Sequence, residues 1–214
     1  MKISFAKFEP PRTGAVVVGV WEEGDLTAPA RQLDELTGGA IKRALAASPK
    51  FNGKRNQLIP IVAPANLSVS RIVLAGLGKP DAVDARGMED LAGTLLAHLN
   101  GAGETEATFA IDTGDAAELA SAAVAAHLGL GAALRAYRFD KYRTTEKAER
   151  KPSLTSLTVA GPAAAEAQRR YETLSATAEA VAFTRDLVSE PANVIYPETL
   201  AEQAAGLSSV GLDV

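Results

Sequence analysis

The segment RIVLAGLG, Arg71–Gly78, is apolar over most of its length and does not alternate with polar residues. A strand has this pattern when both of its faces are covered, because neither row of side chains meets water. The segment therefore predicts a central strand of a buried sheet. The Val-rich run Ala15–Trp21 predicts a second strand.

Further strands and helices alternate on either side of these two segments. Strands are predicted at 3–8, 58–62, 107–111 and 154–160, and helices at 29–47, 85–100 and 116–137. Phe51–Lys54 predicts a hairpin turn before the strand at 58–62. Such alternation is typical of a three-layer α/β/α domain with a central, mostly parallel (mixed) sheet. Gly161-Pro162 closes the last strand, so the first domain is predicted to cover 1–162.

The rest of the chain follows a different pattern. Nothing breaks a helix across 163–189, where apolar residues recur at spacings of three and four. We predict a linker helix of roughly 40 Å there. A loop at Glu190–Asn193 and a helix that begins at Pro197 follow, and 212–214 is expected to open a strand. About 50 residues cannot build a core alone. We therefore interpret 190–214 as the beginning of a C-terminal domain in a truncated protein.

Composition limits the function classes. Hydrophobic residues make up 47% and charged residues 22% of the 214 residues, which excludes a disordered chain. The net charge of −4 and the absence of a basic run argue against binding to nucleic acid. No apolar run approaches the ~20 residues of a membrane span, and the N-terminus lacks the features of a signal peptide. There are no cysteines, which excludes disulfides and thiolate sites and favours a cytoplasmic location.

Few side chains are suited to metal or acid–base chemistry. His98 and His127 both lie in Ala/Leu-rich helical segments, and we expect them to be structural. Asp112, Asp115 and Glu118 could suggest a metal site. Their setting is more typical of a loop that enters a helix N-terminus, where acidic residues are favoured.

One segment could cradle a phosphate. Glycines after a central strand, as in Gly76-Leu77-Gly78, let a ligand approach the backbone. However, Pro80 stands where a Walker motif needs Ser or Thr, and Asp81 replaces the third glycine of a GxGxxG motif. A tight turn at the strand exit is the preferred interpretation, and a nucleotide contact is the alternative.

The segment YRFDKY, Tyr137–Tyr142, combines three aromatic residues with mixed charges. It predicts an aromatic anchor that packs a helix end. The functional alternative is a contact between domains or subunits, where aromatic residues and Arg are enriched.

These segments together resemble the leucyl aminopeptidase family, also called cytosol aminopeptidases or peptidase family M17. The most specific stretch, TRDLVSEPANV at Thr184–Val194, is similar to the family's "RDLVNEPAN" junction, with Ser189 in place of Asn. The segment YPETLA, Tyr196–Ala201, resembles the "TPEYLA" that follows, with Tyr196 in place of Thr. Val73–Lys79 and Tyr137–Tyr142 also stand where the family carries similar segments. The resemblance covers the whole chain.

The resemblance implies a hydrolase with two α/β domains, of which the smaller N-terminal one is similar to a macro domain and the larger C-terminal one is catalytic. Such proteins form hexamers and release N-terminal amino acids from peptides with two divalent metals, Mn²⁺ or Zn²⁺, which activate a bridging water. Motifs of the type "GKGITFDSGG" and "NTDAEGR", which carry the metal ligands, do not occur in these 214 residues. No catalytic, cofactor-binding or metal-binding residue is therefore expected here. We expect an architectural role for these residues instead. The alternative is a macro-like module that binds a nucleotide or ADP-ribose.

Overall fold

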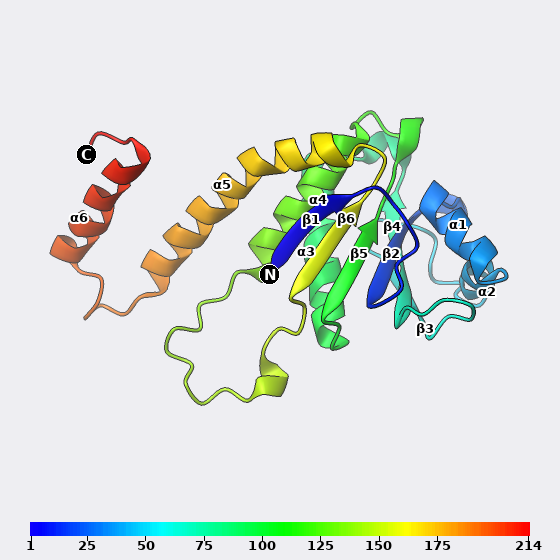
Figure 1. Ribbon diagram of the computed structural model, residues 1–214, viewed down its shortest axis with the longest axis horizontal. Coiled ribbons are helices and arrows are strands. Elements are labelled where there is room, and N and C mark those ends of the chain that lie inside the picture. The colour runs from blue at the N-terminus through cyan, green and yellow to red at the C-terminus, as the bar shows by residue number, and fades with distance from the viewer.

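Six strands form one mixed sheet in the order β1-β6-β5-β2-β4-β3 (Figure 1). The computed structural model describes residues 1–214, apart from the side chain of Ala148. All neighbouring strands are parallel except the antiparallel pair β3–β4. The strands are β1 (Lys2–Ala6), β2 (Ala15–Trp21), β3 (Leu58–Val62), β4 (Arg71–Gly78), β5 (Glu106–Ala110) and β6 (Ser156–Ala160). The predicted mostly parallel sheet is confirmed.

The two strands that were predicted from apolar runs lie side by side in the middle of the sheet. β2 pairs with β4 on one edge and with β5 on the other, so that Val17 lies opposite both Val73 and Phe109. Every residue of β2 is buried. β6 begins at Ser156 rather than at the predicted Leu154, because the N–H of Leu154 donates to Asn100 Oδ1 (2.9 Å) outside the ladder. The first strand likewise ends earlier than predicted, and β5 is displaced by one residue.

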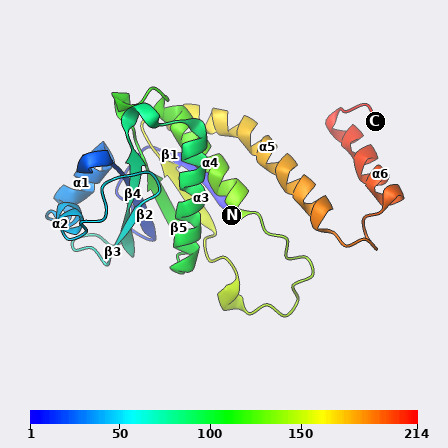
Figure 2. The same ribbon diagram turned by 180° about the vertical axis from the view of Figure 1, so that it is seen from behind.

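Helices cover both faces of the sheet, as the alternating side chains of β2 require. α1 (Ala28–Leu36) and α2 (Ala40–Ala46) pack on the face that carries Val16 and Val18. α3 (Ala85–Gly101) and α4 (Ser121–Ala136) pack on the opposite face, against Ala15 and Val17. In Figure 2, α1 and α2 lie to the left of the sheet, and α3 and α4 lie to its right. The predicted three-layer arrangement is present.

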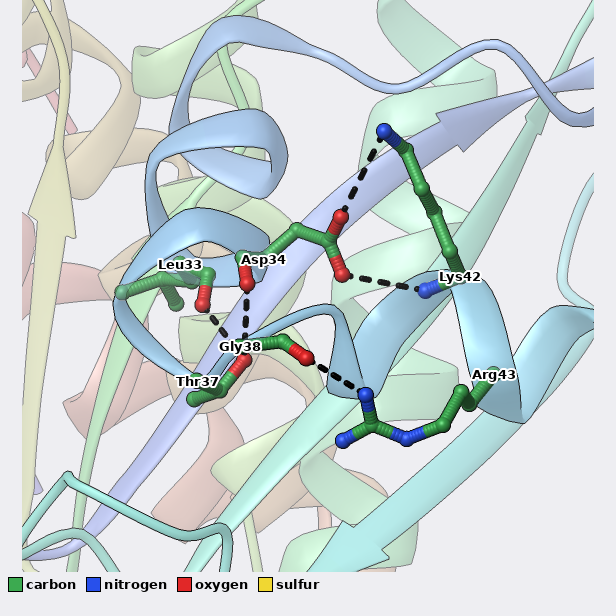
Figure 3. A network of polar contacts seen from close by, with 6 residues as sticks. All are labelled: Leu33, Asp34, Thr37, Gly38, Lys42 and Arg43. Carbon is green, nitrogen blue, oxygen red and sulfur yellow. Dashed lines mark hydrogen bonds and ion pairs between the residues drawn. The ribbon is translucent and has the colours of Figure 1, made fainter.

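The single helix predicted over 29–47 is wrong, because the chain forms two helices there. Gly38 and Gly39 have φ angles of +61° and +84°, in the left-handed region that ends a helix. Asp34 connects α1 to α2 across the break: its Oδ1 accepts from the N–H of Lys42 (3.1 Å), and its Oδ2 pairs with Lys42 Nζ (3.7 Å) (Figure 3). The hydroxyl of Thr37 donates to the Leu33 carbonyl (2.6 Å) in the last turn of α1. The glycine pair therefore turns the chain rather than weakening one helix.

The hairpin turn predicted at Phe51–Lys54 is also wrong. The antiparallel partner of β3 is β4, which follows it, and residues 63–70 join the two strands. Residues 51–57 instead cross the carboxyl end of β4. Gly53 makes this crossing possible, because it has a φ of +74° and a Cβ there would lie 2.0 Å from the Trp21 carbonyl oxygen.

α3 and α4 pack closely against each other. Asp84 caps α3, its Oδ1 accepting from the N–H of Gly87 (2.9 Å). A Cβ on Gly131 of α4 would lie 2.2 Å from the carbonyl oxygen of Glu89, so only glycine allows this approach. α4 begins at Ser121 rather than at Ala116, because a 3-10 turn at Gly114–Ala116 precedes it.

The long helix predicted at 163–189 is present as α5 (Ala164–Ser189), which starts beside α4 and runs beyond the sheet (Figure 1). Near its start Ala167 is buried, and the ring of Tyr171 lies 5.2 Å from that of Phe5 in β1. Val188, at its far end, is 82% exposed. α6 (Pro197–Gly206) follows at a distance from the sheet, and 212–214 forms no strand, contrary to expectation. Within the described residues, no helix is both long and apolar enough to cross a bilayer.

Candidate functional site

Gly76–Gly78 are the last three residues of β4 and not the tight turn that was expected there; Gly78 has a φ of +77°, and a 3-10 turn at Pro80–Ala82 follows the strand. The N–H of Gly76 donates to the carbonyl of Gln57 and the N–H of Gly78 donates to the carbonyl of Gly53, both at 2.8 Å. A Cβ on Gly76 would lie 2.1 Å from the carbonyl oxygen of Lys54. The chain itself therefore uses the two amides that a phosphate would need. The two glycines allow residues 53–57 to pack directly on β4.

The acidic residues after β5 organise a loop. Asp112 Oδ1 accepts from the N–H of Gly114 (2.9 Å) and lies 3.3 Å from the hydroxyl of Ser121, the first residue of α4. Asp115 belongs to the 3-10 turn that precedes α4. In the part of the chain that the structure describes, no three His, Asp or Glu residues are placed to hold a metal ion. No reaction step through a metal is therefore assigned to these residues.

The two histidines lie in helices, as predicted. His127 Nδ1 of α4 is 2.7 Å from Glu89 Oε1 of α3, so this pair joins the two helices. His98 lies in α3, and its Nε2 is buried without a hydrogen-bond partner among the described residues. Burial, and then the nearby charge of Arg71, lowers the pKa of His98. Both positions fit a structural role.

The segment Tyr137–Tyr142 holds the far end of α5. The hydroxyl of Tyr137 donates to Asp186 Oδ1 (2.8 Å), and the guanidinium of Arg185 lies 5.4 Å from the centre of the Tyr137 ring. Lys141 Nζ donates to Glu190 Oε1 (2.6 Å), and the hydroxyl of Tyr142 donates to the other oxygen of the same carboxylate. We call these contacts the α5 anchor; its residues are Tyr137, Lys141, Tyr142, Arg185, Asp186 and Glu190. The predicted aromatic anchor at a helix end is confirmed.

The charges of the α5 anchor support one another. Hydrogen bonds from Lys141 and then Tyr142 lower the pKa of the Glu190 carboxyl. The bond to Glu190 raises the pKa of Lys141 and, more than desolvation does, that of Tyr142. Desolvation, followed by the bond to Asp186, raises the pKa of Tyr137. At neutral pH Glu190 is therefore a carboxylate, Lys141 is an ammonium group, and Tyr137 and Tyr142 are neutral phenols.

The chemistry of the α5 anchor suits positioning rather than catalysis. Its carboxylates are occupied by hydrogen bonds from the chain, and its side chains come from two segments that are far apart in the sequence. It fixes where the polypeptide leaves α5. Sequence analysis identified both segments separately but gave no sign that Asp186 and Glu190 bind Tyr137–Tyr142, because charge and aromatic content do not specify a partner.

A family model, individual relatives and solved structures all relate this chain to aminopeptidases. The family described as "Cytosol aminopeptidase family, N-terminal domain" matches residues 17–146. A probable cytosol aminopeptidase of Caulobacter vibrioides is 41% identical over 216 residues, which cover 100% of this chain and 42% of the relative. One of Rhodopseudomonas palustris is 33% identical over 219 residues, with the same coverage. The chain thus spans about two fifths of the length of these relatives.

Solved structures show the same fold at lower identity. A mutant of tomato leucine aminopeptidase superposes with a TM-score of 0.75 at 23% identity, covering 98% of this chain and 42% of that one. The bottromycin maturation enzyme BotP superposes with a TM-score of 0.67 at 22% identity, covering 93% of this chain and 38% of that one. By the match to the family's N-terminal domain and by the identity to the bacterial relatives, the chain belongs to the cytosol aminopeptidase family.

Proposed function

We propose that these residues form the architectural N-terminal part of an aminopeptidase that releases N-terminal amino acids from peptides. The observation that carries the proposal is the match to the family's N-terminal domain, together with the 42% of the Caulobacter relative that the chain covers. In this proposal the catalytic residues, and two divalent metals such as Mn²⁺ or Zn²⁺, belong to the larger remaining part of such a protein. When bound, the metals supply a hydroxide nucleophile and polarise the peptide carbonyl.

The chain's own contribution is to place that larger part. The buried core of the sheet makes a rigid base, and the α5 anchor ties the far end of α5 to the segment after α4. The polypeptide that follows Glu190 therefore starts from a fixed point. We further propose that the complete protein assembles as a homo-hexamer in the cytoplasm and takes peptides as its partners.

Two measurements test this proposal. The purified chain, incubated with leucine p-nitroanilide and Mn²⁺ or Zn²⁺, is expected to show no hydrolysis. Turnover that scales with the concentration of the chain and survives repurification contradicts an architectural role.

The second measurement asks whether the chain can serve in an active protein. It is joined, at the point that matches Val214, to the remaining part of the Caulobacter relative. We expect metal-dependent aminopeptidase activity and a hexamer by light scattering, with the remaining part alone as control. An inactive but folded chimera argues against the assignment.

A further inference from the structure

We propose that a cleft beside the ends of α3 and α4 binds a small multivalent anion that carries phosphate or carboxylate groups. The cleft has a volume of about 780 Å³, within the range of about 300–1,000 Å³ typical of small-molecule sites. Its walls come from the first residues of β1, the C-terminal ends of α3 and α4, and the segment 149–155 that returns to β6. It lies beside β1, which forms one edge of the sheet, whereas Gly76–Gly78 end β4, next to the strand at the other edge.

Hydrogen bonds hold both limbs of the 137–155 segment, so the cleft has defined walls. The returning limb is fixed to the end of α3, because the N–H of Leu154 donates to Asn100 Oδ1 (2.9 Å). The part of the segment that leaves α4 is fixed by the ion pair of Arg138 with Glu146. It is also fixed by the bond from Lys141 to Glu190. The segment therefore does not need to fold around a ligand to form the cleft.

The charge of the lining is strongly one-sided. Five cationic side chains line the cleft beside a single carboxylate, that of Glu149, although the whole chain has a net charge of −4. The cations are Lys2, Arg135, Arg138, Arg150 and Lys151. Glu146 and Asp140 compensate Arg138. The other four have no carboxylate within 4.0 Å in the described part of the chain.

These cations exceed what the helix ends require. The C-terminus of a helix carries the equivalent of about half a negative charge, and basic side chains near it are favourable. Two such ends, those of α3 and α4, reach the cleft. Together with Glu149 they leave the cleft positive, so the lining attracts an anion rather than merely neutralising the helices.

The positions of the cations call for a ligand with more than one charge. Arg135 belongs to the last turn of α4, whereas Arg150 and Lys151 belong to the segment 149–155 that forms another wall of the cleft. A ligand that pairs with both walls must present an anionic group to each. Arg side chains bind phosphate and carboxylate through two parallel hydrogen bonds, which favours these two groups over monatomic anions.

The test uses tripolyphosphate and citrate as probes in calorimetric titrations of the whole 214-residue chain. We expect one saturable site that is weakened by added salt, and the probe that binds more tightly identifies the preferred group. In the double variant Arg150→Glu/Lys151→Glu, binding should weaken about tenfold or more, as for the loss of one hydrogen bond between charged groups. Both side chains are exposed, so the variant should retain its fold by circular dichroism.

The control is Lys79→Glu/Arg86→Glu, which changes the net charge by the same amount at exposed positions outside the cleft. It should change affinity by less than about twofold, since exposed charges beyond a Debye length of about 10 Å are largely screened. Absence of saturable binding by both probes overturns the proposal. Equal weakening in the two double variants also overturns it, because attraction to the overall charge would then explain the binding. Arg135→Gln provides a second check on the wall that α4 forms and should weaken binding without reversing a charge.

Discussion

Lys141 Nζ lies 2.6 Å from Glu190 Oε1, although 49 residues separate them in the chain. The carboxylate of Glu190 is only 10% exposed, whereas the Lys141 side chain is 58% exposed, so the lysine covers the carboxylate. Ala167, near the start of α5, is the one fully buried residue of that helix in the described chain. Polar contacts of the α5 anchor therefore carry much of the attachment at the far end of α5.

Replacing Lys141 by Met should loosen the far end of α5. The variant keeps the aliphatic length of the side chain but leaves Glu190 with one hydrogen bond from Tyr142. We expect faster hydrogen exchange at 186–195, with exchange in β2 and β4 unchanged, because local opening need not unfold the core.

Lys147→Met is the matched control for this experiment. Lys147 lies on the same connecting segment, and it pairs only with the exposed Glu149, at 4.0 Å. Exchange at 186–195 should remain as in the unchanged chain. An equal effect of both variants would show that the Lys141–Glu190 contact does not hold α5.

Acid should release the same attachment. The folded-state pKa of Glu190 is lowered, chiefly by the bond from Lys141, so its contribution is present above the ordinary value of 4.5. The contribution is lost as the pH falls below 4.5 and through the lower folded value. A carbon-13 NMR titration of the Glu190 carboxyl should give a pKa below 4.5, and Lys141→Met should raise it. An unchanged pKa in the variant would contradict the cause assigned to the shift.

Gly76 is expected to be required for the stability of the fold, whereas Gly101 can be replaced. A Cβ at Gly76 would lie 2.1 Å from the Lys54 carbonyl oxygen. The other nearby atoms belong to the backbone of Gly53, so they are not the end of a flexible side chain. Gly76→Ala should lower the free energy of unfolding by about 3 kcal/mol. Gly101 ends α3 with nothing within 4 Å of its would-be Cβ and no left-handed φ. Gly101→Ala should instead raise the free energy of unfolding by about 0.4–1 kcal/mol.

Urea unfolding measures both glycine variants through the midpoint at an unchanged slope. A tolerated alanine at Gly76 would mean that residues 53–57 do not pack on β4. It would also return the backbone amides of Gly76 and Gly78 to the candidates for phosphate binding.

The parts of the fold that sequence could predict are those that depend on local pattern. Ala15–Trp21 and Arg71–Gly78 were predicted with the observed bounds, because an unbroken apolar run has few other uses than a strand covered on both faces. The break at Gly38-Gly39 was missed, since its geometry depends on Asp34, which binds the backbone of Lys42 in the next helix. The spacing of apolar residues along a helix does not indicate such a contact.

The candidate site could be predicted only in pieces. The aromatic and charged content of Tyr137–Tyr142 indicated an anchor, and the junction motif indicated a connection after α5. Nothing local shows that Lys141 meets Glu190, because the pairing arises only when α4 and α5 lie side by side. The basic cleft was missed for the same reason: Lys2, Arg135 and the pair Arg150-Lys151 stand in separate parts of the sequence and converge only in the fold.

Glu104 is expected to stabilise the start of three strands. One of its carboxylate oxygens accepts from Arg71 Nε at the start of β4 (2.5 Å) and the other from the Ser70 hydroxyl (2.7 Å). That hydroxyl also lies 3.0 Å from the carbonyl oxygen of Gly14, just before β2. Glu104 itself stands two residues before β5. The carboxylate therefore joins strands that lie next to one another in the sheet but are far apart in the chain.

Glu104→Ala should lower the free energy of unfolding by about 2–3 kcal/mol. The side chains of Glu104 and Arg71 are only 8% and 18% exposed, so the variant leaves a largely buried guanidinium without its carboxylate. Glu35→Ala removes an exposed carboxylate from α1 and should change the free energy of unfolding by less than about 0.5 kcal/mol. Urea midpoints distinguish the two variants. If they shift equally, water reaches Arg71 readily and the pair contributes little. If only Glu104→Ala unfolds earlier, this carboxylate holds the starts of β4 and β5 together across β2.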